Sequence, residues 1–245
     1  MIISHAHKYV FVELPLTAST AISRELRQNY EGALHLYKHA TYQDFLRHAS
    51  INEKNYFVFG GIRNPLDKAV SHYYKYKTDH KTAFSSPRRP PLKKRLSFIA
   101  DTSHQRKRYQ FIRNRAADFP SYFNAFYRAP YSDWSILSHK RFDSVIRFER
   151  LQQDFAHTIA KLGIPLARQL PMQNKTNERR TDFVSYYTPE IIPRAQKVFS
   201  PYMRYWEYDF PPEWDKYEDT LGNLIYYHAL NFPRILYWKY LRNKF

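Results

Sequence analysis

The sequence predicts an α/β fold in which helices flank a central, mostly parallel sheet. Apolar runs rich in β-branched and aromatic residues, at 9–12, 56–62 and 144–148, have the length of buried strands. Helical patterns follow these runs, and strands that alternate with helices indicate parallel pairing through helical crossovers. The 245 residues include no cysteine, so the core is expected to form without disulfides.

Expected strands alternate with expected helices through the first third of the chain and again after its middle. The expected strands are 9–12, 33–37, 56–62 and 144–148. The expected helices are one from about Ala21, then 42–48, 66–77, 96–102, 105–117, 120–127, 151–162 and 189–199. Pro65 fits the first turn of the helix at 66–77, and Gly163 with Pro165 ends the helix at 151–162.

Two segments depart from this alternation within what is otherwise interpreted as a single domain, 1–245. Residues 79–95 are basic, contain two proline clusters and have no hydrophobic period, which predicts an exposed, mobile loop. That loop is either a rim over an acidic acceptor or an irregular insertion. Residues 211–245 are rich in aromatic side chains and predict a helical C-terminal extension. Its segment 224–241 is interpreted as a docked helix pair, a homo-oligomer contact or a basic helix on a membrane surface.

The chain is strongly basic, with 39 Lys and Arg against 22 Asp and Glu and a net charge of +17. Such a charge attracts polyanions, which include nucleic acids, acidic membrane surfaces and acidic glycans. No helix-turn-helix, zinc or RNP-like signature accompanies the charge, so no specific nucleic acid is expected. Scattered, solvated charges are the alternative explanation.

The segment after the first strand is a candidate anion site. It contains the small or hydroxylated residues Thr17, Ala18, Ser19 and Thr20, directly before a predicted helix. A helix N-terminus presents free N–H groups and a favourable dipole to a phosphate or sulfate, and hydroxyls add further donors. The alternative is an ordinary turn capped by Thr17 or Ser19.

A second candidate anion site follows the strand at 56–62. Arg63 stands at the strand end and Ser71 lies two turns into the next helix, so the two can converge on one anion. An arginine fork suits a terminal phosphate monoester. Two such anion sites, each at a strand-to-helix corner of one sheet, are expected for a nucleotide with phosphates at both ends.

These two corners resemble motifs of the sulfotransferases that use 3′-phosphoadenosine 5′-phosphosulfate (PAPS). The sequence Leu-Pro-Leu-Thr-Ala-Ser-Thr at 14–20 resembles the family's 5′-phosphosulfate loop, and Ile-Arg-Asn-Pro-Leu-Asp at 62–67, with the residues to Tyr73, resembles its 3′-phosphate motif. Similar segments continue at 145–163, 170–176 and 186–210, so the resemblance covers most of the chain in order.

The resemblance implies a P-loop-like three-layer fold and a transferase that moves a sulfuryl group from PAPS to an acceptor hydroxyl, with no metal. It assigns PAPS binding to the following residues: Pro15, Leu16, Thr17, Ala18, Ser19, Thr20, Arg63, Ser71 and Lys175.

His39 is the candidate catalytic base. The segment 36–45 around it is similar to one in glycan-modifying members, notably the uronyl and heparan 2-O-sulfotransferases. The resemblance implies that His39 takes the proton of the acceptor hydroxyl and that the acceptor is an acidic glycan. An imidazole titrates near neutrality and suits this role. With 11 histidines in the chain, a structural or merely exposed His39 is the alternative.

Leu16 departs from the family pattern, because the family's loop has a lysine at this position. Losing one electrostatic contact of this kind typically costs about 10²–10³ in rate. Three explanations compete. Another cation, with Lys38 and Lys75 as candidates, takes the place of the loop lysine, or the enzyme is slow. In the third, the chain is a non-catalytic nucleotide- or polyanion-binding protein on the same fold.

The remaining expectations concern the compartment. Neither a leader nor a run of about 20 apolar residues that spans a bilayer is expected from this sequence. The lack of cysteine fits a reducing cytosol, so a cytoplasmic protein is predicted. Peripheral membrane association and a Golgi-lumenal origin are the alternatives.

Overall fold

The computed structural model describes residues 1–86, 95–137, 142–171 and 182–241. The chain divides into two compact units. The sheet unit comprises residues 1–64 and 132–175, and the helical unit comprises residues 65–131 and 176–245. The chain therefore leaves the sheet unit after Asn64 and re-enters it at Ser132. The single domain expected for residues 1–245 stays a prediction.

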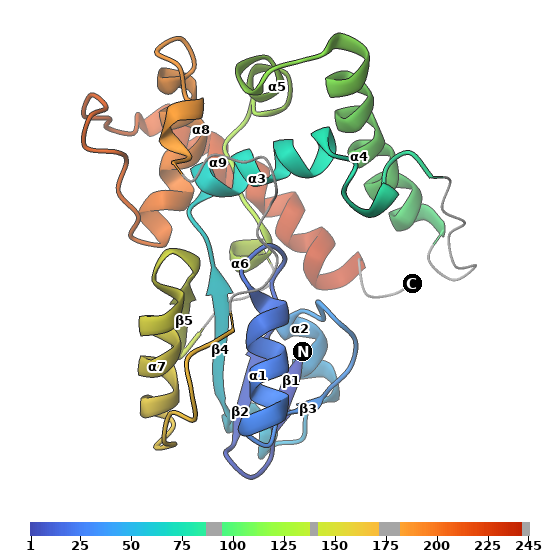
Figure 1. The fold of residues 1–245 in the computed structure, drawn as a ribbon, viewed down its shortest axis with the longest axis vertical. Helices are drawn as coiled ribbons and strands as arrows, with labels where there is room; N and C mark the ends of the chain where they lie inside the picture. Colours follow the sequence, from blue (N-terminus) through green and yellow to red (C-terminus); the bar gives the residue numbers. More distant parts are fainter. Residues whose placement is uncertain (87–94, 138–141, 172–181, 242–245) are drawn as a thin grey trace. The chain divides into compact units, whose positions relative to one another are not determined.

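The sheet unit contains a five-stranded sheet with the order β3-β1-β2-β4-β5 (Figure 1). Its strands are β1 (Ile2–Ser4), β2 (Tyr9–Val12), β3 (Ala33–Leu34), β4 (Phe57–Ile62) and β5 (Ser144–Arg147). Its helices are α1 (Ser19–Asn29), α2 (Tyr42–His48), α6 (Trp134–Leu137), α7 (Leu151–Lys161) and the 3₁₀ turns η1 (Glu53–Asn55) and η4 (Phe148–Arg150).

The α/β class is confirmed, and the sheet is mixed. β4 pairs in parallel with β2 and β5, whereas β1 pairs antiparallel with β2 and β3. Strand β1 was not predicted, because a three-residue strand is too short to show a period. The parallel pairs place the ends of β2, β4 and β5 at one edge, since Val12 lies opposite Gly60 and Gly60 opposite Val145.

Helices cover both faces of this sheet. Tyr9 and Phe11 of β2 point to the face that α1 and α7 cover, where Ile22 and Phe155 are fully or almost fully buried. Val10 points to the opposite face, which α2 covers with Phe45. This alternation is the period of two that a strand with two buried faces requires.

The helical unit consists of α3 (Pro65–Lys77), η2 (His80–Thr82), α4 (Arg95–Arg115), α5 (Phe119–Phe126), η5 (Val184–Tyr186), α8 (Ile192–Tyr205), α9 (Leu221–Leu236) and the π-helical turn η6 (Tyr237–Leu241). Aromatic rings dominate its core. Phe123, for example, is fully buried and lies against the rings of Tyr127, Tyr187 and Phe199.

Several predicted helix boundaries need correction. The two helices predicted at 96–102 and 105–117 form one helix, α4. The predicted C-terminal pair at 224–241 is one helix, α9, that continues into η6. The basic loop predicted at 79–95 includes η2, and its residues 87–94 lie outside the described part of the chain.

Candidate functional site

The β2–α1 loop, residues 13–18, has a backbone that few sequences adopt. Leu16 and Ala18 both have left-handed φ angles, of 64° and 57°, a conformation that costs energy in a residue with a Cβ atom. Ala18 is the N-cap of α1 and has no side-chain oxygen to accept from the first-turn amides. The alternative in which Thr17 or Ser19 is the N-cap is therefore wrong.

Thr17 instead holds the loop together. Its Oγ1 donates a hydrogen bond to the Leu14 carbonyl at 2.9 Å, and its side chain is almost completely buried. The loop rests on β4 at Gly61, where a Cβ atom would lie only 2.8 Å from Thr17 O and Thr17 Oγ1. The close approach of loop and strand therefore requires a glycine at position 61.

Arg63 brings a guanidinium to the same loop from the end of β4. Its Nη1 donates to the Leu16 carbonyl at 3.3 Å, and its Cζ lies 4.0 Å from the centre of the Phe148 ring. Arg63 is only 7% exposed. The ring and the carbonyl together orient the planar guanidinium, an arrangement that lysine cannot reproduce. Phe148 had not been predicted to contribute.

Lys38 supplies a second cation beside the loop. Its Nζ donates to Thr20 Oγ1 in the first turn of α1, at 3.4 Å. Of the two lysines predicted as substitutes for a loop lysine at Leu16, Lys38 is thus in contact with the predicted anion-binding segment. Lys75 belongs to α3 of the helical unit.

His39 is fixed against the other end of the loop. Its Nδ1 lies 2.8 Å from the Glu13 carbonyl. A carbonyl oxygen only accepts hydrogen bonds, so Nδ1 carries the proton and Nε2 of the neutral ring has a lone pair. Trp134 meets the imidazole edge-on, with 6.1 Å between the ring centres. No hydrogen bond to Nε2 occurs among the residues that the structure describes.

The surroundings of His39 favour its neutral form. Burial lowers the pKa of the imidazole below its ordinary value, and the nearby Lys38 charge lowers the pKa further. The hydrogen bond with the Glu13 carbonyl acts in the opposite direction. A neutral imidazole with an accessible lone pair is the form that a general base requires.

The other predicted PAPS contacts are not all brought to this place. Pro15 and Leu16 are part of the loop, and Ser19 and Thr20 begin α1. Ser71 is buried in α3 of the helical unit, whereas Arg63 belongs to the sheet unit, so their convergence on one phosphate stays a prediction. Lys175 lies outside the described residues.

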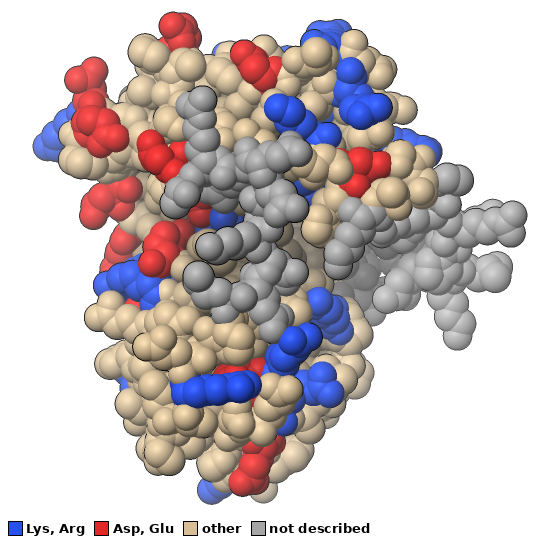
Figure 2. Space-filling model, viewed as in Figure 1, with Lys and Arg blue, Asp and Glu red and all other residues tan. Residues whose placement is uncertain are grey.

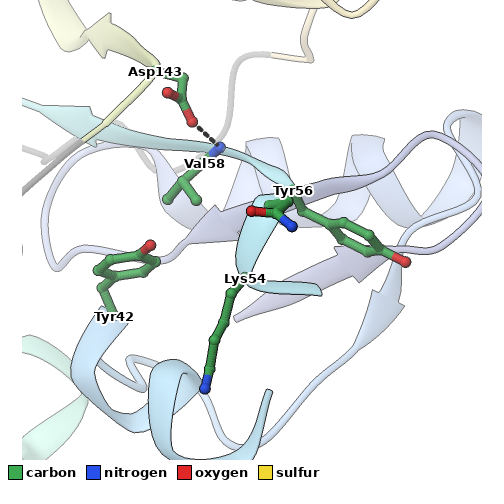
Figure 3. Close-up of a pocket in the computed structure, with 6 residues that line it drawn as sticks. Tyr42, Lys54, Tyr56, Val58 and Asp143 are labelled. Atoms are coloured by element: carbon green, nitrogen blue, oxygen red, sulfur yellow. Dashed lines mark hydrogen bonds between the residues drawn. The ribbon is translucent and has the colours of Figure 1, made fainter. Parts of the chain in front are cut away.

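A cavity of about 250 Å³ lies elsewhere in the sheet unit (Figure 3). Its lining residues are Tyr42, Lys54, Asn55, Tyr56, Val58 and Asp143. The Val58 amide donates to Asp143 Oδ2 at 2.8 Å. This cavity is at the beginning of β4, and Arg63 follows the end of that strand, so the cavity does not include the candidate site.

In the part of the chain that the structure describes, no group of three or more His, Asp or Glu side chains is arranged to hold a metal ion. None of its helices combines the length and the apolar character that crossing a membrane requires.

Comparison with known proteins gives no relative: no protein-family model matches the chain, and no curated protein or solved structure is significantly similar to it.

Proposed function

We propose that this protein is a PAPS-dependent sulfotransferase that transfers a sulfuryl group to a hydroxyl of an acidic glycan. The observation that carries the proposal is the His39 imidazole, held by its Nδ1 beside the β2–α1 loop with Nε2 as a proton acceptor. The resemblance of the loop at 14–20 and of the segment at 62–73 to PAPS motifs supports the choice of donor.

In the proposed reaction, the acceptor hydroxyl oxygen attacks sulfur as its proton passes to Nε2 of His39. The new S–O bond forms while the bond between sulfur and the phosphate oxygen breaks. The electron pair of the broken bond remains on the phosphate of 3′-phosphoadenosine 5′-phosphate, the second product. No oxidant, reductant or metal is needed to balance this transfer.

The developing charge on the leaving phosphate requires donors. The amides at the start of α1 and the hydroxyls of Ser19 and Thr20 are suited to this task. The Thr17 hydroxyl already donates to the Leu14 carbonyl, so Thr17 contributes by holding the loop in place. Lys38 compensates for Leu16 in this proposal, because its ammonium lies 3.4 Å from Thr20 Oγ1. Arg63 binds the 3′-phosphate, and Lys175 contributes to cofactor binding. The P-loop-like arrangement of the layers is part of the same proposal.

An acidic glycan is proposed as the acceptor class for two reasons. The net charge of +17 attracts a polyanion. The His39 segment resembles that of glycan-modifying family members. On α4, exposed basic side chains such as Arg106 and Lys107 provide further contacts for an acidic polymer.

The direct test is turnover with radiolabelled PAPS and a panel of uronate-containing glycans. We expect His39→Ala to lower turnover by about 10²–10⁴-fold, the usual contribution of a general base. Affinity for 3′-phosphoadenosine 5′-phosphate should stay unchanged, and added imidazole should restore part of the turnover.

The matched control is His5→Ala, because the His5 side chain is 63% exposed. This variant should keep full turnover. If His39→Ala retained the wild-type rate, His39 would have no catalytic role. If the wild type bound the bisphosphate and transferred sulfate to no acceptor, the non-catalytic binding protein, which the missing loop lysine at Leu16 favours, would replace the proposal.

A further inference from the structure

Helix α9 is attached to the helical unit through its polar residues. Asn223 Nδ2 donates to the Lys197 carbonyl and to Asp219 Oδ1, both at 3.0 Å. Arg234 Nη1 donates to the Pro130 carbonyl at 3.3 Å. Asn223 and Asn231 are both only 4% exposed. The buried residues of α9 are Asn223, Tyr227 and Asn231, so the side that packs against its own unit presents two amides and one tyrosine.

The outward side of α9 is apolar. Leu221, Ile225, Phe232 and Leu236 are 74%, 60%, 66% and 40% exposed. At about 100° per residue, these four side chains fall within about 60° of arc. Tyr226, Tyr237 and Tyr240 are also exposed and widen this surface.

This arrangement is the reverse of an ordinary surface helix, which buries its apolar side and exposes its polar side. A contiguous exposed apolar surface indicates a site for a partner or a membrane. We call the seven exposed side chains the α9 outer face.

The charges of the C-terminal segment indicate what covers the α9 outer face. From Thr220 to Phe245 the sequence contains no Asp or Glu and four basic residues, Arg234, Lys239, Arg242 and Lys244. The segment just before it, 207–219, contains six acidic residues and one lysine. Figure 2 shows acidic side chains gathered along this connection between α8 and α9.

We propose that the α9 outer face binds an anionic phospholipid surface. Leucine, isoleucine and phenylalanine side chains then enter the boundary between headgroups and acyl chains, as in helices that lie in the membrane interface. Tyrosine rings suit this depth, because they are apolar with one polar end. The basic residues of the segment are attracted to the anionic headgroups.

A second copy of the chain fits the α9 outer face less well. A twofold contact between two α9 helices brings the same surface together from both molecules. It would place two acid-free, basic segments side by side without a compensating carboxylate, and like charges disfavour this. The acidic segment at 207–219, in contrast, is repelled by an anionic surface and helps to orient α9 on it.

The test is flotation of the full-length protein with lipid vesicles. The first vesicles contain phosphatidylcholine alone, and in the second part of it is replaced by phosphatidylserine. We expect binding to the phosphatidylserine vesicles only, and weaker binding at high salt. Ile225→Glu combined with Phe232→Glu should weaken this binding by about tenfold or more, because two apolar contacts are lost and two anionic charges are added.

The matched control is Ile51→Glu, which places the same charge at an apolar side chain that is 82% exposed in the sheet unit. It should bind vesicles like the wild type, and so should Phe232→Leu. Circular dichroism and gel filtration establish that each variant folds.

The proposal would be overturned if the wild type did not float with phosphatidylserine vesicles, or if it bound both kinds of vesicle equally. It would also be overturned if the double variant bound as tightly as the wild type. A wild-type dimer that the double variant converts to a monomer, without vesicle binding, would assign the α9 outer face to a second copy. This test does not involve PAPS, so its outcome is independent of the proposed reaction.

Discussion

In the sheet unit, the β2–α1 loop is held by specific polar contacts, whereas the helical unit is held mainly by aromatic rings. The loop depends on the hydrogen bond from Thr17 to Leu14 and on the contact with Gly61. In the helical unit, even the charged Arg108 lies among rings, with Nη1 donating to Tyr122 Oη at 2.9 Å. Burial raises the pKa of Tyr122 well above its ordinary value.

The contacts of the two units differ in what they are suited to do. Polar groups at fixed distances, such as His39 Nδ1 and the Glu13 carbonyl, are able to position a reacting molecule. Packed rings are adapted to stability, since their energy comes from burial. Substitutions in the loop are therefore expected to change ligand binding and turnover more than substitutions in the aromatic core, which should mainly change the free energy of unfolding.

The largest expected effect on stability is in the aromatic core. Phe123→Ala removes a fully buried ring and should lower the free energy of unfolding by about 3–5 kcal/mol. The measurement is urea denaturation followed by circular dichroism. Its matched control is Phe232→Ala, because Phe232 is 66% exposed, and this change should stay within about 0.5 kcal/mol. Equal effects at the two positions would contradict the described core.

Removing the Lys38 cation beside the loop should have the next largest effect. Lys38→Met keeps the length of the side chain and removes its charge. If Lys38 stabilises the leaving phosphate, turnover should fall by about 10²–10³-fold, which corresponds to about 2.7–4 kcal/mol. Lys54→Met is the control, because Lys54 lines the separate cavity. An unchanged rate in Lys38→Met would show that another group replaces the loop lysine.

Gly61→Ala tests the contact between the loop and β4. The added Cβ would lie 2.8 Å from Thr17 O, so the loop must shift, at a cost of about 1–3 kcal/mol in unfolding free energy. Gly222→Ala is the control in the helical unit, because a Cβ atom added there would point into open space. In helix α9 this change should be neutral or stabilising by up to about 1 kcal/mol. Affinity for the bisphosphate should fall in Gly61→Ala only.

The smallest expected effect is a displacement of the pH profile. Because burial lowers the pKa of His39, the ring stays neutral below the ordinary value of about 6.5. The acid limb of kcat/KM should therefore lie below pH 6.5, and Lys38→Met should move the limb upward. An acid limb above pH 6.5 in the wild type would contradict the assignment of His39 as the base.

The lowered pKa of His39 also makes the stability of the protein depend on pH. The unfolded chain binds a proton at His39 more readily than the folded chain. Stability from this group is therefore fully present above the unfolded pKa of about 6.5 and is lost as the pH falls toward the lower folded pKa.

Local patterns predicted the elements around the candidate site well. The helix at 42–48 was predicted with its exact bounds, and in the structure Thr41 and Asp44 form a capping box at its start. The loop was predicted from its small residues. Its left-handed residues Leu16 and Ala18 were not, because neither residue type favours that conformation.

Contacts between distant segments could not be predicted. Nothing in the sequence indicates that Phe148 lies against Arg63, or that Trp134 meets His39. The pair Gly60-Gly61 inside a strand is a signal for close backbone approach that had been available. The polar attachment of α9 was hidden because Asn223 depends on the Lys197 carbonyl, 26 residues away in the sequence.

Calorimetric titration with 3′-phosphoadenosine 5′-phosphate, followed by AMP under the same conditions, tests the central claim most directly. If the loop and Arg63 bind a nucleotide with phosphates at both ends, the bisphosphate should bind about 10- to 100-fold more tightly than AMP, and Arg63→Ala should remove this preference. Equal affinities for the two nucleotides, or an unchanged preference in Arg63→Ala, would contradict the account.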